Sequence, residues 1–252
     1  MIIDISYYNV ITDWQKVAAA VEGVIIRLGY SGYGSGKPTL DKCYLDNLDA
    51  CKRFKIPHGV FFFPASITAA EAKKEAEFIA EFIAGQDLKL GVWLDSEIAE
   101  VKNKSGRADK LSRWSRTELL HIIIDRLKEL GIVAGVYAST SWLLNNLDMS
   151  ALPNVAVWAA QYNKEEICTY PGAYIMHQYT SKGSVPGIRG NVDLNRLVFS
   201  PGDAVSVDDA ELDAALEVIA KRVIAGSFGQ GHEIRKNTIY NLIRQKVNDI
   251  LK

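Results

Sequence analysis

Short apolar runs rich in β-branched and aromatic residues recur along the first four fifths of the chain, separated by segments with helical periodicity. Runs of this length and composition are typical of buried strands. Eight strands are predicted, at Ile2–Ser6, Val24–Leu28, Val60–Phe63, Val92–Asp95, Val133–Tyr137, Val155–Ala159, Tyr174–Gln178 and a short piece near Val192. Helices are predicted over Leu40–Phe54, Ala69–Ala84 and Thr117–Leu130, whereas the later connections are too short for full helices.

The alternation of strands with helices predicts an α/β fold. It indicates a mainly parallel sheet whose strands are buried on both faces. Eight such strands predict a closed or nearly closed, irregular TIM-like β/α barrel with fewer outer helices than strands. In such barrels the reacting groups lie at the C-terminal ends of the strands. Thr68 and Glu71 stand in the register of a capping box at the start of the second helix.

The composition changes after Asp193, and this change predicts a second, smaller domain. We expect a catalytic barrel over residues 1–200, a linker over 201–207 and a small all-α domain over 208–252. Pro201 and Gly202 resist regular structure, and Asp208 and Glu211 stand in capping-box register for a helix behind them. A piece this short can hardly build a stable core on more than two or three helices.

The segment GVWLDSE delivers two carboxylates, Asp95 and Glu97, at positions i and i+2. In an extended strand this spacing places both on one face, roughly 6.5 Å apart along the axis, a separation typical of carboxylate pairs that act on a glycosidic bond. Acidic residues also follow strands simply because the chain enters a solvated loop. Two further apolar segments carry Asp4 and Asp193, however, so we expect one shared acidic site.

Cleavage of a sugar acetal needs a proton for the departing oxygen and a stabiliser for the positive charge at the anomeric carbon. Glu97 is the better acid by reach, and the shorter Asp95 suits orientation of a substrate group. Sugars also bind to flat apolar faces with polar tips, although strand aromatics are equally common in cores. The candidate sugar-binding residues are Phe61, Phe63, Trp158, Tyr162, Gln178 and Tyr179. Arg27 could contact the substrate or form a scaffolding ion pair.

Composition and charge exclude several classes of function. The formal net charge of −1 and the pI near 6.4 argue against a general nucleic-acid binder. No apolar run approaches the roughly 20 residues that span a bilayer, and no signal-peptide pattern opens the chain, so we expect no membrane insertion. Three cysteines without paired spacing predict free thiols. We expect no metal or cofactor, although a metal-dependent barrel hydrolase using the four carboxylates stays as a rival.

Motifs spread over all the predicted strands resemble a known family in both order and spacing. They are MIIDIS, IIRLGY, HGVFFF, VWLDSE, GVYAS, VWAAQY, HQYTSKGSVPGI and GNVDLN, and they cover residues 1 to about 200. The family is glycoside hydrolase family 25, the Chalaropsis-type lysozymes common among phage endolysins. The resemblance implies that Glu97 is the catalytic acid and that Asp95, Asp4 and Asp193 are its acidic companions. Phe61 stands where the family usually has Tyr, and His177, expected as pocket wall, stands where it often has Trp.

The resemblance also implies the substrate, which is the β-1,4 bond between N-acetylmuramic acid and N-acetylglucosamine in peptidoglycan. We expect the acetamido oxygen of the substrate to attack the anomeric carbon while Asp95 holds the amide. Direct attack by water, with Asp4 or Asp193 as base, is the competing mechanism, and product stereochemistry separates the two. A barrel that binds cell walls without cutting them is the alternative function.

The end of the chain is similar to the cell-wall-binding repeat of certain phage lysins. VIAGSFGQGHEIRK followed by YNLIRQKVN carries that pattern once, with Phe228 where Trp is usual. The resemblance implies wall-binding roles for Phe228, Arg235 and Tyr240. Because the repeat is short and occurs once, we also expect self-association through this region. An endolysin would be made in the host bacterial cytoplasm and would reach the wall with the help of a holin-type partner.

Overall fold

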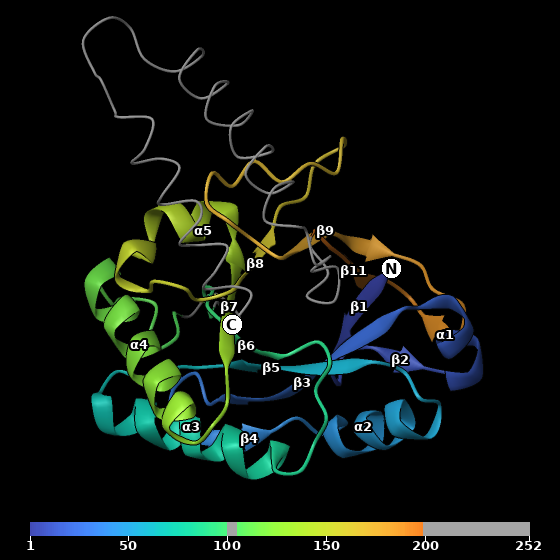
Figure 1. The fold of residues 1–252 in the computed structure, drawn as a ribbon, viewed down its shortest axis with the longest axis horizontal. Helices are drawn as coiled ribbons and strands as arrows, with labels where there is room; N and C mark the ends of the chain where they lie inside the picture. Colours follow the sequence, from blue (N-terminus) through green and yellow to red (C-terminus); the bar gives the residue numbers. More distant parts are fainter. Residues whose placement is uncertain (100–104, 199–252) are drawn as a thin grey trace, which may run out of the picture. The chain divides into compact units, whose positions relative to one another are not determined.

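The computed structural model describes residues 1–99 and 105–198 (Figure 1). In these residues eight strands close into a barrel. Their order around the barrel is β1-β11-β9-β8-β7-β6-β5-β3, and the pairing of β1 with β3 closes the ring. The strands are β1 (Ile2–Ile5), β3 (Gly23–Ser31), β5 (His58–Phe63), β6 (Val92–Asp95), β7 (Ala134–Ser139), β8 (Val157–Ala160), β9 (Met176–Gly183) and β11 (Val192–Leu197). The predicted TIM-like barrel is therefore confirmed.

Each predicted strand has a counterpart, and two of them, β3 and β9, extend furthest beyond their predicted ends. β3 continues to Ser31 because its end pairs with β4 (Pro38–Leu40), which was not predicted. Leu40, expected to open a helix, pairs there with Gly29 instead. β9 continues to Gly183 because it forms a hairpin with β11. A separate two-stranded sheet of β2 (Val10–Ile11) and β10 (Ile188–Arg189) was also not predicted.

The last strand of the barrel, β11, is antiparallel to both of its neighbours. β11 is antiparallel to both β1 and β9, whereas the other neighbouring strands of the barrel are parallel to each other. The start of β11 therefore lies at the end of the barrel where the parallel strands finish. This direction brings Asp193, the second residue of β11, opposite Asp4 of β1.

Within the described residues the helices are fewer than the barrel strands, as predicted. They are α1 (Trp14–Ala20), α2 (Tyr44–Arg53), α3 (Ala69–Ile83), α4 (Arg113–Glu129) and α5 (Thr140–Asn145), with a 3-10 turn at Met149–Ala151. α1 was not predicted, and α4 begins earlier than predicted because Ser112 caps it. The hydroxyl of Thr68 accepts from the Glu71 amide at 3.3 Å, while the Glu71 carboxylate accepts from the Ile67 amide at 2.9 Å.

Two apolar layers follow from the alternation of side chains along the strands. One set fills the barrel and includes Ile2, Ile25, Trp93, Trp158 and Met176. The larger set lies between the strands and the helices, and its residues occupy the alternate strand positions. Asp4 follows Ile2 by two positions, and Asp95 follows Trp93 by two. Both carboxylates therefore point into the barrel, above its apolar filling.

The described barrel forms a compact unit, Met1–Val198. The predicted linker at 201–207 and helical domain at 208–252, with Phe228, Arg235 and Tyr240, lie outside the described residues. Within the described ranges, none of the helices is long and apolar enough to cross a membrane. Cys43, Cys51 and Cys168 are free thiols.

Candidate active site

Four carboxyl groups from three strands meet at one mouth of the barrel. Asp4 comes from β1, Asp193 from β11 and Asp95 from the end of β6, and Glu97 follows two residues later. They line one cavity of about 310 Å³, which is within the size range of small-molecule sites. The shared acidic site expected from the sequence is thus present in the structure.

Asp4 is buried and held by two amides. Its Oδ2 accepts from Gln178 Nε2 and from Asn195 Nδ2, both at 2.8 Å. Burial first, and then the neighbouring Asp193, raise the pKa of Asp4 to about 8. Burial raises the pKa of Asp193 to about 6. Because the buried Asp4 and the half-buried Asp193 face each other and cannot both ionise readily, the pair retains a proton near neutral pH.

Asp95 is buried at the end of β6, where its carboxyl faces the cavity. Burial, followed by the charges of Glu97 and Asp4, raises its pKa well above the usual range, and Arg27 opposes that shift. Its Oδ1 has no hydrogen-bond partner among the described residues. A buried acceptor without a partner is costly in the free protein, and it is suited to receive an N–H group of a ligand.

Glu97 is the most exposed member of the cluster, whereas Asp193 is half-buried. Partial enclosure by protein atoms and the charge of Asp193 raise the pKa of Glu97, as a proton donor near neutral pH requires. The residue before it is fixed from two sides. The Ser96 amide donates to the Tyr137 carbonyl at 2.9 Å, and Ser96 Oγ accepts from Trp142 Nε1 at 3.1 Å.

Gln178 links the acidic site to two tyrosines. Its Oε1 accepts from the hydroxyl of Tyr137 at 2.7 Å and also from the hydroxyl of Tyr162. Its Nε2 donates to Asp4, so both ends of this buried amide are occupied. Gln178, predicted as a sugar contact, therefore lines the cavity mainly as the group that orients Asp4 and both hydroxyls.

The predicted aromatic residues divide into two groups. Phe61, Trp158 and Tyr162 line the cavity. Trp158 forms part of its floor, because it is 1% exposed and its Nε1 donates to Asn195 Oδ1 at 2.9 Å. Phe63 is buried away from the cavity in a small cluster with Ala65.

The side chains on either side of Gln178 point the other way. Tyr179 lies outside the cavity and packs against Arg196, whose guanidinium carbon is 4.9 Å from the ring centroid. His177, expected as pocket wall, contacts the Gln161 carbonyl at 3.1 Å on the same outer face. The strand alternation explains both placements, since neighbours of an inward residue point outward.

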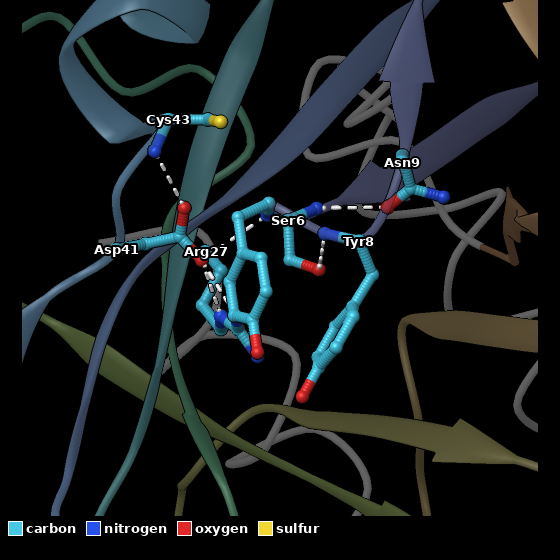
Figure 2. Close-up of polar contacts among 7 residues, drawn as sticks. Ser6, Tyr8, Asn9, Arg27, Asp41 and Cys43 are labelled. Carbon is cyan, nitrogen blue, oxygen red and sulfur yellow. Dashed lines mark hydrogen bonds and ion pairs between the residues drawn. The ribbon is translucent and has the colours of Figure 1, made fainter.

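Arg27 lines the cavity but is committed to an ion pair (Figure 2). Its Nε donates to Asp41 Oδ2 at 2.7 Å, and Asp41 Oδ1 accepts from the Cys43 amide at 2.9 Å. The guanidinium carbon lies 4.9 Å from the ring centroid of Tyr7 and 5.2 Å from that of Tyr8. The structure thus places Arg27 in the scaffold beneath the rim of the cavity.

Several residues of the site were not predicted from the sequence. Asn195, Tyr137, Tyr8, Tyr33 and Asp41 belong to this group. Asn195 stands two positions after Asp193, so strand alternation alone would have placed it on the same inner face. Asp41 had no such signal, because only the β3–β4 hairpin brings it to Arg27.

The arrangement can donate a proton from an accessible carboxyl and surround a developing positive charge with further carboxyls. An eight-stranded β/α barrel with such a mouth has the architecture of a barrel glycoside hydrolase. Within the described part of the chain, no group of three or more His, Cys, Asp or Glu side chains is placed to hold a metal ion.

Comparison with known families agrees with the class of barrel glycoside hydrolases. The family model "Glycosyl hydrolases family 25" matches residues 3–188, and the chain belongs to this family. The family named from the sequence motifs is therefore confirmed for the barrel.

Several named proteins are similar to this chain in sequence or in fold. The chain is 22% identical over 213 residues to the autolytic lysozyme of Clostridium acetobutylicum, which covers 81% of this chain and 61% of the relative. It is 32% identical to the modular autolysin LytC of Streptococcus pneumoniae, with a TM-score of 0.66 over 77% of this chain and 45% of that one. The catalytic domain of endolysin ply40 from bacteriophage P40 of Listeria monocytogenes has the same fold, with 23% identity, a TM-score of 0.60 and coverage of 77% and 90%. The chain thus spans about three fifths of the lysozyme and less than half of LytC.

Proposed function

We propose that this protein is a peptidoglycan hydrolase that cleaves the β-1,4 bond between N-acetylmuramic acid and N-acetylglucosamine. The observation that carries the proposal is the pairing of an accessible acid, Glu97, with the buried and unpartnered oxygen of Asp95. Both occur in a family 25 barrel whose relatives include an autolytic lysozyme and an autolysin.

In the proposed mechanism Glu97 gives its proton to the departing glycosidic oxygen. Asp95 Oδ1 accepts the N–H of the 2-acetamido group and turns the amide carbonyl oxygen toward the anomeric carbon. That oxygen forms a bond to the anomeric carbon as the glycosidic bond breaks. Water then opens the resulting ring while Glu97 takes back a proton. Two displacements at one carbon give retention of configuration.

Direct attack by water is the competing route, and the state of Asp4 weighs against it. With a pKa of about 8 and two amide donors on Oδ2, Asp4 is a poor base at neutral pH. Asp193, whose pKa is raised to about 6, is the better candidate for that route. NMR of the first-formed sugar product decides between them, since inversion would require the direct route.

The experiment that tests the function is digestion of purified peptidoglycan by the wild type and by Glu97→Gln. Borohydride reduction labels the new reducing ends before mass spectrometry. We expect muramitol ends from the wild type and a rate about 10²–10⁴-fold lower from the variant, the usual contribution of a general acid. Glucosaminitol ends would contradict the bond specificity, and the absence of any cut would favour a non-catalytic wall-binding module.

The biological role we propose is that of a phage or prophage endolysin. Its support is the resemblance of the whole chain to lysins and the match of the barrel to a phage endolysin domain. In this role the protein is made in the host bacterial cytoplasm, reaches the wall through a holin-type partner and binds peptidoglycan with its last residues. Self-association through residues 208–252 belongs to the same proposal.

A further inference from the structure

Arg116 of α4 is a buried cation that the proposed mechanism does not use. Its side chain is 7% exposed. Its Nη2 donates to the carbonyls of Asp109 and Leu111 at 3.2 and 3.3 Å, whereas its Nε has no hydrogen-bond partner among the described residues. Removing a cation from water costs free energy, and two carbonyl contacts offset that cost only in part. Stability alone therefore does not account for this arginine.

Arg116 and Glu97 line the same small chamber. The other lining residues include Ser96, Ala99 and Asp109, and the volume of the chamber is about 30 Å³. It is too small for a sugar ring, so it is a region of support and not a ligand site. Among the described residues Glu97 is the one that lines both this chamber and the acidic cavity. The proposed acid thus stands between the cavity for the substrate and the residues that support it.

One path from Arg116 to the acid runs through Trp142 of α5. The guanidinium carbon lies 4.8 Å from the centroid of the Trp142 ring, within the range of a cation–π contact. Trp142 Nε1 in turn donates to Ser96 Oγ at 3.1 Å, and Ser96 stands immediately before Glu97. The indole has a single N–H donor, so the plane of the ring decides where that donor points. By stacking on the ring, Arg116 helps to hold the residue before the acid.

The second path runs through Asp109. Its carbonyl accepts from Arg116, and its carboxylate accepts from the amides of Ala99 and Gly106 at 2.9 and 2.5 Å. Ala99 stands two residues after Glu97. Hydrogen bonds from backbone amides to a carboxylate are among the stronger ones in proteins, so the backbone after the acid is also held. Arg116 contacts both of the residues that fix the neighbours of Glu97.

We propose that Arg116 is a positioning residue for Glu97. It acts on both sides of the acid, through Trp142 and through Asp109. This inference rests on the proposed function, in which Glu97 protonates the departing oxygen. A general acid must lie within hydrogen-bond reach of that oxygen, and a misplacement of about 1 Å can cost on the order of 10²-fold in rate. Because the Glu97 side chain is exposed, its position depends on the backbone on either side of it.

A change of leaving group separates positioning of the acid from a merely structural role. One substrate is a soluble peptidoglycan glycan, whose departing sugar oxygen must be protonated. The other is a dinitrophenyl β-glycoside of a glycan fragment that ends in N-acetylmuramic acid, whose phenolate departs without a proton. The quantity measured on both is kcat/KM, which compares free enzyme and substrate with the transition state for bond cleavage.

Two variants weaken the support of the acid in different ways. Arg116→Met removes the guanidinium, and Trp142→Phe keeps an aromatic face for Arg116 but removes the donor to Ser96. Arg126→Met is the matched control, because Arg126 lies on the same helix, pairs with Glu77 at 3.0 Å and does not line the chamber. Thermal unfolding reports the stability of each variant. Trp142→Phe, the milder change, decides the question if Arg116→Met is unstable.

We expect kcat/KM on the glycan to fall about 10–100-fold in both variants, and to stay near wild type on the dinitrophenyl glycoside and in the control. Equal losses on both substrates, or no loss on the glycan in a folded variant, would overturn the positioning role. Glu97→Gln, assayed in parallel, should show the same dependence on the leaving group. If it lost equally on both substrates, or if the wild type cut neither, the proposed function would fail instead, so the two failures are distinguishable.

Discussion

At the scale of single residues, the carboxyl of Asp4 differs from an ordinary aspartate through its surroundings. It is buried, faces Asp193 across the β1–β11 pairing and accepts two amide donors on one oxygen. Burial and Asp193 raise its pKa to about 8, so the folded chain keeps a proton that the unfolded chain releases near pH 4. The resulting contribution to stability is present at low pH and is lost as the pH rises from about 4 through 8.

Asp4→Asn should therefore stabilise the protein increasingly as the pH rises from 5 to 8. The asparagine keeps an oxygen for the donors of Gln178 and Asn195 and removes the charge that repels Asp193. We expect a gain of about 1 kcal/mol or more at pH 8, or roughly 2–4 °C in Tm for a chain of this size, and a smaller gain at pH 5. Thermal unfolding at both pH values measures it, with the exposed Asp49→Asn as control. A gain that does not depend on pH would contradict this account of Asp4.

At the scale of elements, the antiparallel strand β11 assembles the site. Its Asp193 faces Asp4, and its Asn195 joins three strands, since it donates to Asp4 of β1 and accepts from Trp158 of β8. One residue earlier or later in register, both side chains would point to the outer layer. The direction and register of this strand therefore decide which residues the acidic cavity contains.

Asn195→Leu should destabilise the barrel by about 1–3 kcal/mol, because it leaves the buried Trp158 Nε1 without its acceptor and removes one donor from Asp4. Urea unfolding followed by tryptophan fluorescence measures the loss. Asn195→Asp is the informative companion, since it keeps an acceptor for Trp158 but adds a negative charge beside Asp4. Its destabilisation should grow as the pH rises, and a loss that stays constant with pH would argue against charge repulsion.

At the scale of the whole molecule, the barrel carries the proposed chemistry and the last residues are proposed to hold it on the wall. The described barrel ends at β11, whose last residue is Leu197. A wall-binding segment beyond it would raise the local concentration of enzyme on an insoluble polymer without changing the chemistry at Glu97.

Deletion of the residues after Pro201 should lower lysis of whole cells about tenfold or more, as loss of tethering does, and should leave turnover of soluble glycan fragments much closer to wild type. Turbidity of cell suspensions and release of reducing ends from soluble fragments are the two measurements. Equal losses on both substrates would show that the removed residues support the stability of the barrel.

The sequence by itself determined the strands of the barrel and the inward direction of two of its acids. Apolar runs of four to six residues define buried strands whatever their partners, and the period of two places Asp4 with Ile2 and Asp95 with Trp93. The family motifs, spread over all the strands, identified the class of protein. These features are local, so the order of residues along the chain is enough to show them.

Only the tertiary structure decided how distant segments meet. The reversal of β11, the Arg27–Asp41 ion pair and the bonds of Gln178 join residues far apart in the chain, and their geometry depends on how the strands close around the core. The pKa shifts of the four acids are a property of this assembly, because desolvation and mutual repulsion arise only when the carboxyls are brought together.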